Sequence, residues 1–353
     1  MNELKRKPKK ANSLLILLLI VVGVLILPFQ VFSSDQKPAR IIFYNVENLF
    51  DTENDSLTLD EEFLPKGERF WNNRKLQAKL KRIYQTILAA GEGTMPAAIG
   101  LCEIENLHVL EMLLSATPLG KLGYKIIHKE SPDHRGIDVA LLYHSGLFVP
   151  LNYQAYAVKN PDDKGFATRD ILHVEGVIET DTFHLFVNHW PSKFGGVVET
   201  KPLRALAAQK LKQVVDSLFT QSKFNVIIMG DFNDSPIDES LTKHLMARKP
   251  TDNVDTKALY NLAYPRTEQG EGTNKYHGKW EMIDQFIVGG RLLHTGIISE
   301  ESFEIFKPDF LLEKDKNYLG EKPFRTYIGY KYNNGFSDHL PILLDLNLTP
   351  SGK

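Results

Sequence analysis

Short apolar runs recur along most of the chain, and polar residues follow several of them directly. Apolar runs of about four to eight residues, bounded by turn-forming residues, are typical of buried β-strands. We therefore predict strands at residues 40–46, 97–101, 125–128, 138–143, 171–178, 182–187, 225–229, 282–288 and 341–346.

Helical patterns lie between some of these strands. In residues 75–90, leucine and isoleucine recur every three or four positions, so we expect one apolar face, with the basic residues on the other face. Residues 203–218 repeat the pattern, and 106–114 form a shorter candidate. Strands dominate and do not alternate regularly with helices. This predicts an α/β fold of two packed sheets with helices on the outer faces, not a parallel barrel.

Two long stretches, 51–73 and 301–332, are predicted to be surface loops. The first is rich in Asp, Glu and Gly. Loops this long in a compact domain are usually functional or mobile.

The N-terminus differs from the rest of the chain. Basic residues 5–10 precede an almost unbroken apolar run at 14–29, which is the layout of a secretory signal. The run is at the short end for a membrane span, so an uncleaved anchor stays open. A buried core helix fits less well, because nothing polar gives the run a face. We expect residues 1–34 to be a signal peptide or N-terminal membrane anchor, residues 35–353 to form one domain, and the protein to be exported: periplasmic, secreted or tethered.

Composition limits the partners. The chain has 353 residues, 42% of them hydrophobic, which is ample for a large core. Cys102 is the only cysteine, so no intrachain disulfide can form, and we interpret it as a small buried hydrophobe. The formal net charge of -2 predicts no strong nonspecific attraction for polyanions. A nucleic acid or phosphate substrate would therefore be held by a local patch and a metal.

The clearest polar cluster follows the predicted strand at 225–229. Asp231 and Asn233 are two residues apart, so in extended backbone they point the same way. Together they could position a water and stabilise a phosphorane oxygen. The alternative is a plain strand-to-turn corner, because Asp and Asn are also turn formers.

Two further clusters offer oxygen ligands. Asn45 and Glu47 have the same spacing at the end of the first strand, and Glu103 ends the second. Such hard ligands suit Mg²⁺. Taken singly, each is better explained as a solvated strand end.

His189 and His339 each lie at a strand end and offer the base and acid of general acid–base catalysis. Asp284 lies inside an apolar run, where an unpaired carboxylate is costly, so we expect a histidine partner. His339 would then be oriented by Asp284 as a triad base is by its carboxylate. Ser192 and Lys193, after His189, are predicted to form a phosphate-binding turn.

Arginines are the remaining phosphate candidates. Arg135 could meet a phosphate with Asp138 as its partner, or both residues could simply cap a strand. Arg169 and Arg204 are further candidates on weaker grounds.

Taken in order, these segments resemble the endonuclease/exonuclease/phosphatase superfamily, which has the DNase-I-like fold. The resemblance spans roughly residues 40–346. It implies a four-layered α/β sandwich, with two packed, mainly antiparallel sheets flanked by helices, and a Mg²⁺-dependent attack of water on a phosphoester, with Mn²⁺ as a possible substitute. The matching elements are Asn45, Glu103, Asn188-His189, Gly230-Asp231-Phe232-Asn233, Asp284 and Ser337-Asp338-His339.

The resemblance also implies a metal site in residues 35–353, the catalytic domain. Glu103 would be the principal ligand, with Asn45, Glu47 and Asp338 close by. The metal would neutralise charge and activate water.

For catalysis, the resemblance implies that Asp231 orients the nucleophilic water and that Asn233 helps to hold the phosphate. His339, paired with Asp284, would act as base or stabilise the phosphorane. His189 would protonate the leaving group or bind phosphate.

The substrate is less closely defined. Cys102 precedes Glu103, where the family most often has Gln, and the Pro-Ala-Trp-Cys-Asp-Arg-like segment of the inositol-phosphate phosphatases is missing. Residues 278–284 are closer to the nuclease branches. We expect a nuclease acting on DNA or RNA with little sequence preference, and we infer no protein partner.

Two alternatives remain. One is a phospholipid or sphingolipid phosphodiesterase, for which Tyr327, Tyr330 and Tyr332 keep the option open, or a phosphomonoesterase. The other is a catalytically dead binding module, which fits less well because no expected acid or histidine is replaced.

Overall fold

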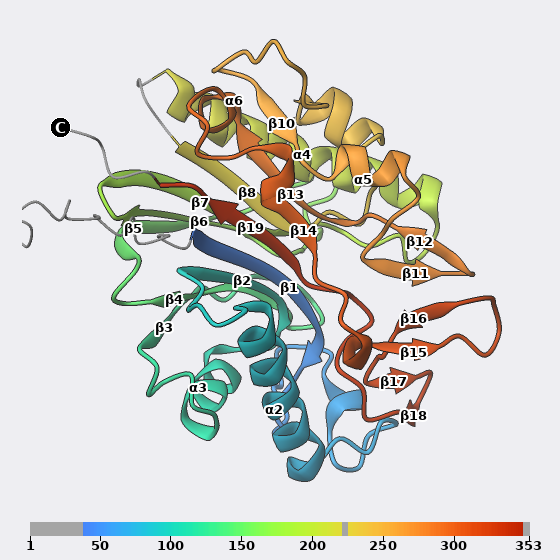
Figure 1. The fold of residues 1–353 in the computed structure, drawn as a ribbon. Coiled ribbons are helices and arrows are strands. Elements are labelled where there is room, and N and C mark those ends of the chain that lie inside the picture. The colour runs from blue at the N-terminus through green and yellow to red at the C-terminus, as the bar shows by residue number, and fades with distance from the viewer. Residues whose placement is uncertain (1–37, 221–224, 349–353) are drawn as a thin grey trace, which may run out of the picture. The chain divides into compact units, whose positions relative to one another are not determined.

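Two β-sheets stack face to face, and helices cover their outer faces (Figure 1). The computed structural model describes residues 38–220 and 225–348. In spatial order, the first sheet contains β14 (Phe303–Ile305), β19 (Ile342–Leu346), β1 (Ala39–Leu49), β2 (Ala98–Ile104), β4 (Asp138–His144) and β3 (Tyr124–His128). The second contains β5 (Val149–Tyr156), β6 (Ile171–Ile178), β7 (Asp181–His189), β8 (Asn225–Asp231), β13 (Asp284–Gly289), β10 (Leu259–Asn261) and β9 (Ala247–Arg248).

Most neighbouring strands are antiparallel. The parallel pairs are β1 with β2, β7 with β8 and β9 with β10. Strand β1 is buried along most of its length because β19 and β2 flank it and side chains cover both its faces. It enters the fold at Ala39 and carries Asn45 towards its other end.

The helices complete four layers. On the first sheet lie α2 (Asn73–Ala90) and α3 (Leu107–Ala116); α4 (Val197–Phe219), α5 (Tyr264–Glu268) and α6 (Gly290–His294) lie on the side of the second (Figure 1). Asn72 caps α2 by accepting a hydrogen bond from the Lys75 backbone N–H. The predicted four-layered α/β sandwich is confirmed.

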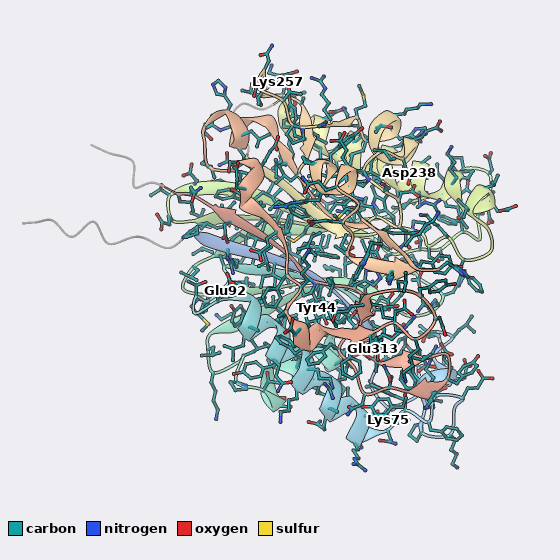
Figure 2. The ribbon with its side chains drawn as sticks, turned by 45° about the vertical axis from the view of Figure 1, so that its right-hand side comes forward. Tyr44, Lys75, Glu92, Asp238, Lys257 and Glu313 are labelled. Atoms are coloured by element: carbon teal, nitrogen blue, oxygen red, sulfur yellow. The ribbon has the colours of Figure 1, made fainter. Side chains whose placement is uncertain are left out.

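The apolar core fills the space between the layers. Tyr44 lies inside, whereas Lys257 and Glu92 project at the surface (Figure 2). One expectation for α2 was wrong. Lys79 lies on its apolar face and is 1% exposed, because its ammonium group finds polar partners inside the protein.

The predicted strands and helices are all present, and α4 begins earlier than the apolar pattern indicated. Several strands were missed. The edge strand β5 is mostly exposed, so it has no apolar run. The predicted loop 301–332 is not free of structure, because it contains β14 and two hairpins whose strands are too short to show a period. The hairpins outside the main sheets are β11 (Asn274–Tyr276) with β12 (Lys279–Glu281), β15 (Leu312–Lys314) with β16 (Glu321–Pro323), and β17 (Tyr327–Ile328) with β18 (Lys331–Tyr332).

The predicted signal or anchor, residues 1–34, lies outside the described residues. Within the described ranges, no helix has the length and apolar character needed to cross a membrane.

Candidate active site

Three predicted site residues form a row across the second sheet. His189 at the end of β7 and Asp284 at the start of β13 are both register partners of Asp231 at the end of β8. Gly230 makes this row possible. A Cβ there would lie 2.5 Å from the Asn188 carbonyl oxygen, so no larger residue fits without moving β7.

The first sheet contributes Asn45 and Glu103 from its parallel strands β1 and β2. The register is interrupted beyond Asn45 and again at Glu103. Glu103 has a φ of 61°, and Glu47 and Asn48 have φ values of 54° and 56°. Left-handed backbone at non-glycine residues is strained and clusters at functional sites. Here it breaks the strand alternation and turns the Glu103 carboxylate to the Asn45 side.

Asn45 joins the two sheets. Its Nδ2 donates to Asp231 Oδ2 at 3.1 Å and to Glu103 Oε1 at 3.4 Å. The Asn48 N–H donates to the other oxygen, Glu103 Oε2, at 2.9 Å. The site therefore spans the ends of both sheets.

His339 is held on two sides. Its Nδ1 lies 2.7 Å from Asp284 Oδ2, and its backbone N–H donates to Ser337 Oγ at 3.1 Å. Thr273 Oγ1 donates to the same Asp284 oxygen at 2.5 Å. Burial alone would lower the pKa of His339, but the carboxylates of Asp284 and Asp231 raise this pKa well above its usual range. The charged imidazolium form of His339 is therefore favoured.

Asp231 lies between the two histidines. Its Oδ2 is 3.7 Å from His189 Nε2 and 3.9 Å from His339 Nε2, and its Oδ1 accepts the Asn233 N–H at 2.9 Å. Burial raises the pKa of Asp231 to about 7, against the opposing effect of His339. Burial, with Arg169 nearby, lowers the pKa of His189 well below its usual value. One histidine is thus neutral and the other charged.

Glu47 and Asp338 share a cation that sequence reasoning missed. Arg325 lies 2.8 Å from Asp338 Oδ2 and 3.4 Å from Glu47 Oε1. Glu47 also accepts the backbone N–H of Thr326 at 2.5 Å. Burial would raise the pKa of Asp338, but Arg325 and His339 hold it below its ordinary value.

Lys79 is the second missed residue. Its Nζ donates to Thr326 Oγ1 at 2.6 Å and to the Phe336 carbonyl at 2.7 Å. Burial lowers its pKa to about 8, although Glu47 and Asp338 favour the charged form. Lys79 therefore fastens α2 to the segment that carries Asp338 and His339.

These partners leave Glu103 as the carboxylate that best fits a divalent metal. Among the described residues it forms no ion pair with a lysine or arginine, and its neighbour Asn45 offers an oxygen atom of the hard kind that such ions take. Asp231, Asp284 and His339 form a second group, with ligand atoms all within 4.8 Å of one another. The Asp284–His339 hydrogen bond already engages two of its members.

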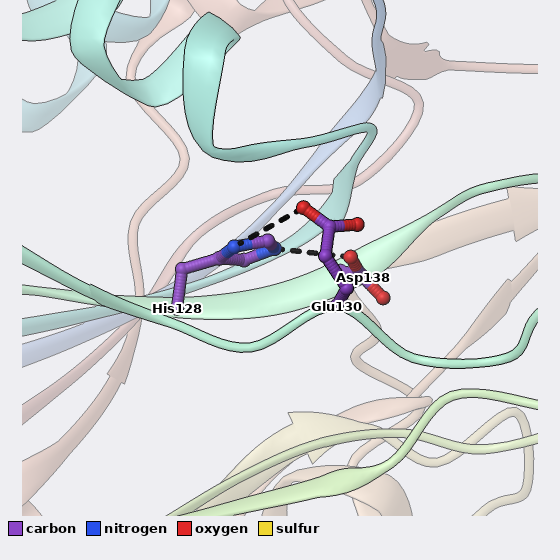
Figure 3. A group of neighbouring side chains, drawn as sticks. All are labelled: His128, Glu130 and Asp138. Atoms are coloured by element: carbon purple, nitrogen blue, oxygen red, sulfur yellow. Dashed lines mark hydrogen bonds and ion pairs between the residues drawn. The ribbon is translucent and has the colours of Figure 1, made fainter. Parts of the chain in front are cut away.

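Arg135 reaches the site through the loop between β3 and β4. Its Nη2 donates to Asn48 Oδ1 at 2.8 Å, and most of the side chain is exposed. Asp138 is not its partner: it pairs with His128 Nε2 at 3.0 Å and accepts from the Ser131 N–H at 3.0 Å (Figure 3). This cluster fixes the start of the loop that presents Arg135.

The remaining predicted phosphate ligands bind other protein groups. Lys193 lies 3.7 Å from Glu281, and Ser192 Oγ accepts the Phe194 N–H at 3.3 Å. Asn233 Nδ2 donates to the Trp190 carbonyl at 3.1 Å, and no donor to its Oδ1 is found among the residues that the structure describes.

Arg169 and Arg204 are poor phosphate candidates, because both are buried and already paired. Arg169 contacts Asp133 at 2.8 Å and two backbone carbonyls, and Arg204 contacts Asp234 at 2.8 Å. They are structural.

Of the missed residues, only Lys79 had a sequence signal, because it falls between Leu76 and Leu80 on the apolar face of a helix. Arg325 lies in an irregular stretch and had none.

Solved structures share this architecture. The catalytic domain of human Nocturnin, solved with a bound sulfate anion, is 16% identical and has a TM-score of 0.52, covering 88% of this chain and 95% of that chain. Truncated TDP2 from Caenorhabditis elegans is also 16% identical, with a TM-score of 0.52 and coverage of 87% and 96%. An endonuclease/exonuclease/phosphatase family protein from Bacteroides thetaiotaomicron is 17% identical, with a TM-score of 0.51 and coverage of 87% and 94%. At these identities the similarity establishes the fold.

The sequence identifies the class of enzyme. Residues 40–348 match the sequence model of the Endonuclease/Exonuclease/phosphatase family, whose members are metal-dependent phosphoric ester hydrolases. No curated protein sequence matches the chain. The chain belongs to this family, and the predicted resemblance is confirmed.

Proposed function

We propose that the protein is an exported, Mg²⁺-dependent phosphodiesterase that hydrolyses DNA or RNA with little sequence preference. The observation that carries the proposal is the position of Asp231. One oxygen of this carboxylate lies within 3.9 Å of a neutral histidine and a charged one, and Asn45 links it to Glu103.

Asp231 is the base in this proposal. A carboxylate with a pKa of about 7 can hold a water and take its proton near neutral pH. His339, kept charged by Asp284, stabilises the negative charge that develops on the phosphorane. His189 donates a hydrogen bond from the opposite side of Asp231 to the phosphate or the leaving oxygen.

Glu103, Asn45 and Asp338 are the proposed metal ligands. When bound there, Mg²⁺ would supply charge neutralisation and lower the pKa of a coordinated water. Glu47 belongs to the same acidic group but serves mainly to hold residues 325–327, because both its oxygens accept hydrogen bonds from them.

A polymeric, anionic substrate fits the cations around the site. Arg135 is exposed beside Asn48, and Lys322 and Arg325 line a pocket together with Asp338. Basic side chains that contact the phosphate backbone position a nucleic acid without reading its bases. This arrangement supports low sequence preference.

The decisive experiment is a substrate panel with the purified protein. Plasmid DNA, RNA, sphingomyelin vesicles and a phosphomonoester are each incubated with Mg²⁺, with Mn²⁺ and with EDTA. We expect DNA or RNA cleavage that EDTA abolishes and Mg²⁺ restores. No turnover of any substrate with either metal would leave only the binding-module alternative.

Substitutions test whether that activity comes from this site. We expect Glu103→Gln and His339→Ala each to lower the rate by at least about a hundredfold without changing the circular dichroism spectrum. Glu179→Gln, a distant charge-neutralising change, serves as a control for the preparation. Cleavage that survives Glu103→Gln would place the metal elsewhere.

One observation keeps a lipid substrate as the second candidate. Leu319 is 95% exposed at the β15–β16 turn, beside Tyr318, and this turn adjoins a pocket that includes Asp338. An exposed apolar tip beside the site could enter a membrane surface. Turnover of sphingomyelin vesicles that Leu319→Ser abolishes, without nucleic acid cleavage, would favour this alternative.

Export is tested separately. Mass spectrometry of the protein's N-terminus after cell fractionation distinguishes a cleaved signal, which we expect near residue 34, from an intact anchor. Recovery of the protein with an intact N-terminus in the cytoplasmic fraction would contradict export.

A further inference from the structure

The turn that follows His189 presents one aromatic side chain to solvent. Phe194 is 92% exposed. In the part of the chain that the structure describes, no other ring packs against it and no cation lies over it. A single exposed apolar residue is ordinary on a protein surface. This one, however, lies five residues after a histidine of the candidate active site, so its ring is available to a molecule bound there.

The backbone around Phe194 is fixed, although its side chain is not packed. The Gly196 N–H donates to the Lys193 carbonyl at 3.1 Å, which closes a turn with Phe194 and Gly195 at its centre. Gly195 has a φ of 89°, the positive value that the third residue of a type II turn requires. A Cβ at Gly195 would meet no atom within 4 Å, so the glycine serves the backbone conformation. The Phe194 N–H also donates to Ser192 Oγ at 3.3 Å.

The turn is joined directly to the active site. The Trp190 N–H donates to the Asp231 carbonyl at 2.9 Å, so the chain is still paired with the end of β8 just before the turn begins. Lys193 Nζ lies 3.7 Å from the carboxylate of Glu281 in β12, the strand that precedes Asp284. The turn therefore holds the Phe194 ring at a defined place beside the site. A preorganised group of this kind loses little entropy when it binds a ligand.

We propose that Phe194 stacks on a nucleobase next to the phosphodiester bond that is cleaved, and that the enzyme therefore prefers single-stranded nucleic acid. This inference rests on the proposed nuclease function. A phosphate held beside His189 and Asp231 leaves the adjoining nucleotide near the turn, with Lys193 close to its backbone. Every base has a π-face, so stacking adds affinity without sequence preference. In a duplex the bases are already stacked on one another, and exposing one costs free energy.

Two exposed valines follow the turn at the start of α4. Val197 is 58% exposed and Val198 is 78% exposed. An apolar tip of this kind could also enter a lipid surface. A nucleobase is favoured because the ring is held in register with the groups that would bind the phosphodiester, whereas a side chain that only enters a membrane needs no such register. The valines carry no π-face, so they provide a control for the ring.

Steady-state kinetics of the full-length protein on two single strands test the proposal. One is an oligonucleotide of the nucleic acid that the substrate panel shows to be cleaved, and the other has the same length but lacks all its bases. Phe194→Ala should raise KM for the first strand by at least about fivefold and leave KM for the second unchanged. Stacking stabilises the bound substrate and the transition state alike, so kcat should stay within about twofold. Phe194→Tyr should behave as the wild type, and so should Val198→Ala, the matched control.

Binding gives a second readout without turnover. A strand that carries a fluorescent base analogue, whose emission is quenched by stacking, is titrated with the protein in EDTA. We expect quenching with the wild type and with Phe194→Tyr, and much less with Phe194→Ala at equal saturation. The wild type should also cleave the single strand faster than the duplex of the same sequence.

Three results would overturn the inference while the nuclease activity itself stands. They are equal KM values for the wild type and Phe194→Ala, a wild type that cleaves both single strands equally well, and equal rates on single strand and duplex. Binding to lipid vesicles that Phe194→Ala and Val198→Ala reduce alike, with unchanged nucleic acid cleavage, would assign the turn to a membrane instead. A protein that cleaves no nucleic acid would refute the proposed function, and this inference with it.

Discussion

Replacing Asp284 with asparagine changes the charge state of the active site with little change of shape. In the wild type, Asp284 Oδ2 lies 2.7 Å from His339 Nδ1 and keeps that histidine charged. Asparagine fills the same volume and can still hydrogen-bond the ring. What it removes is the negative charge, so Asp284→Asn isolates the electrostatic contribution.

The magnitude follows from the distance. Two unit charges 2.7 Å apart attract by about 6 kcal/mol at an effective dielectric constant of about 20. If relaxation and the retained hydrogen bond recover about half of this, the loss is about 3 kcal/mol, which corresponds to roughly two pKa units. The pKa of His339 should therefore fall, because burial opposes its charged form and then meets less opposition. Phosphorane stabilisation would fall with the charged fraction of His339.

The assay is a pH profile of kcat/KM from pH 5 to 9. In Asp284→Asn the alkaline limb should move to lower pH, because the imidazolium is lost earlier. The acid limb should move to higher pH, because His339, whose charge lowers the pKa of Asp231 more than Asp284 raises it, loses that charge. At pH 7.5 we expect a loss of about a hundredfold.

Thr273→Val is the matched control. It removes the 2.5 Å hydrogen bond to Asp284 but keeps the charge, so activity should fall while both limbs stay near their wild-type positions. An Asp284→Asn profile that overlays the wild type, or a loss below threefold, would show that His339 does not act as a cation.

Four other substitutions test separate parts of the structure. Asp231→Asn should lower kcat by about 10²–10⁴ and remove the acid limb near pH 7, measured by steady-state kinetics. Lys79→Met leaves the buried Thr326 hydroxyl without its donor, at about 1–3 kcal/mol, and the Phe336 carbonyl with only the long Thr326 Oγ1 bond of 3.4 Å, so urea unfolding should show a lower free energy of unfolding. Asp133→Asn breaks the buried ion pair with Arg169 and should cost about 3–5 kcal/mol in the same assay. Burial lowers the pKa of His173 to about 4 in the folded protein. As pH falls below 6.5, His173 therefore takes up a proton in the unfolded chain before it does so in the folded protein. Up to about 3 kcal/mol of stability is lost by pH 4. His173→Phe should reduce that loss, measured by urea unfolding at pH 7.5 and pH 4.5.

Each of these predictions has a contrary result. For Asp231→Asn it is an unchanged acid limb; for Lys79→Met and Asp133→Asn it is a free energy of unfolding equal to that of the exposed control Asp162→Asn. For His173→Phe it is an acid-induced loss as large as in the wild type.

The contact between Asp284 and His339 could be predicted from the sequence because burying an unpaired carboxylate costs free energy in any fold. A carboxylate inside an apolar run must have a partner, and few partners sit at strand ends. The two sheets could be predicted for a similar reason, since short apolar runs form buried strands irrespective of which strands they pair with.

Arg325 and Lys79 could not be placed in the same way. Arg325 meets Glu47 across 278 positions of sequence, and Lys79 meets Phe336 across 257. Their roles depend on how distant segments fold together. The place of Lys79 between Leu76 and Leu80 indicated burial but no partner, and Arg325 on its own resembles an ordinary surface cation. The hairpins at 312–332 were missed because strands of two or three residues show no period.

The direction of β1 has a practical consequence for handling the enzyme. The strand receives the chain at Ala39 and delivers Asn45 to the active site six residues later, a separation of roughly 20 Å at about 3.3 Å per residue. Ala39 and the reactive groups thus lie far apart along one rigid strand. Coupling the protein to a resin through its N-terminal side should leave the site open to long polymers, whereas coupling near the 312–332 hairpins should obstruct it.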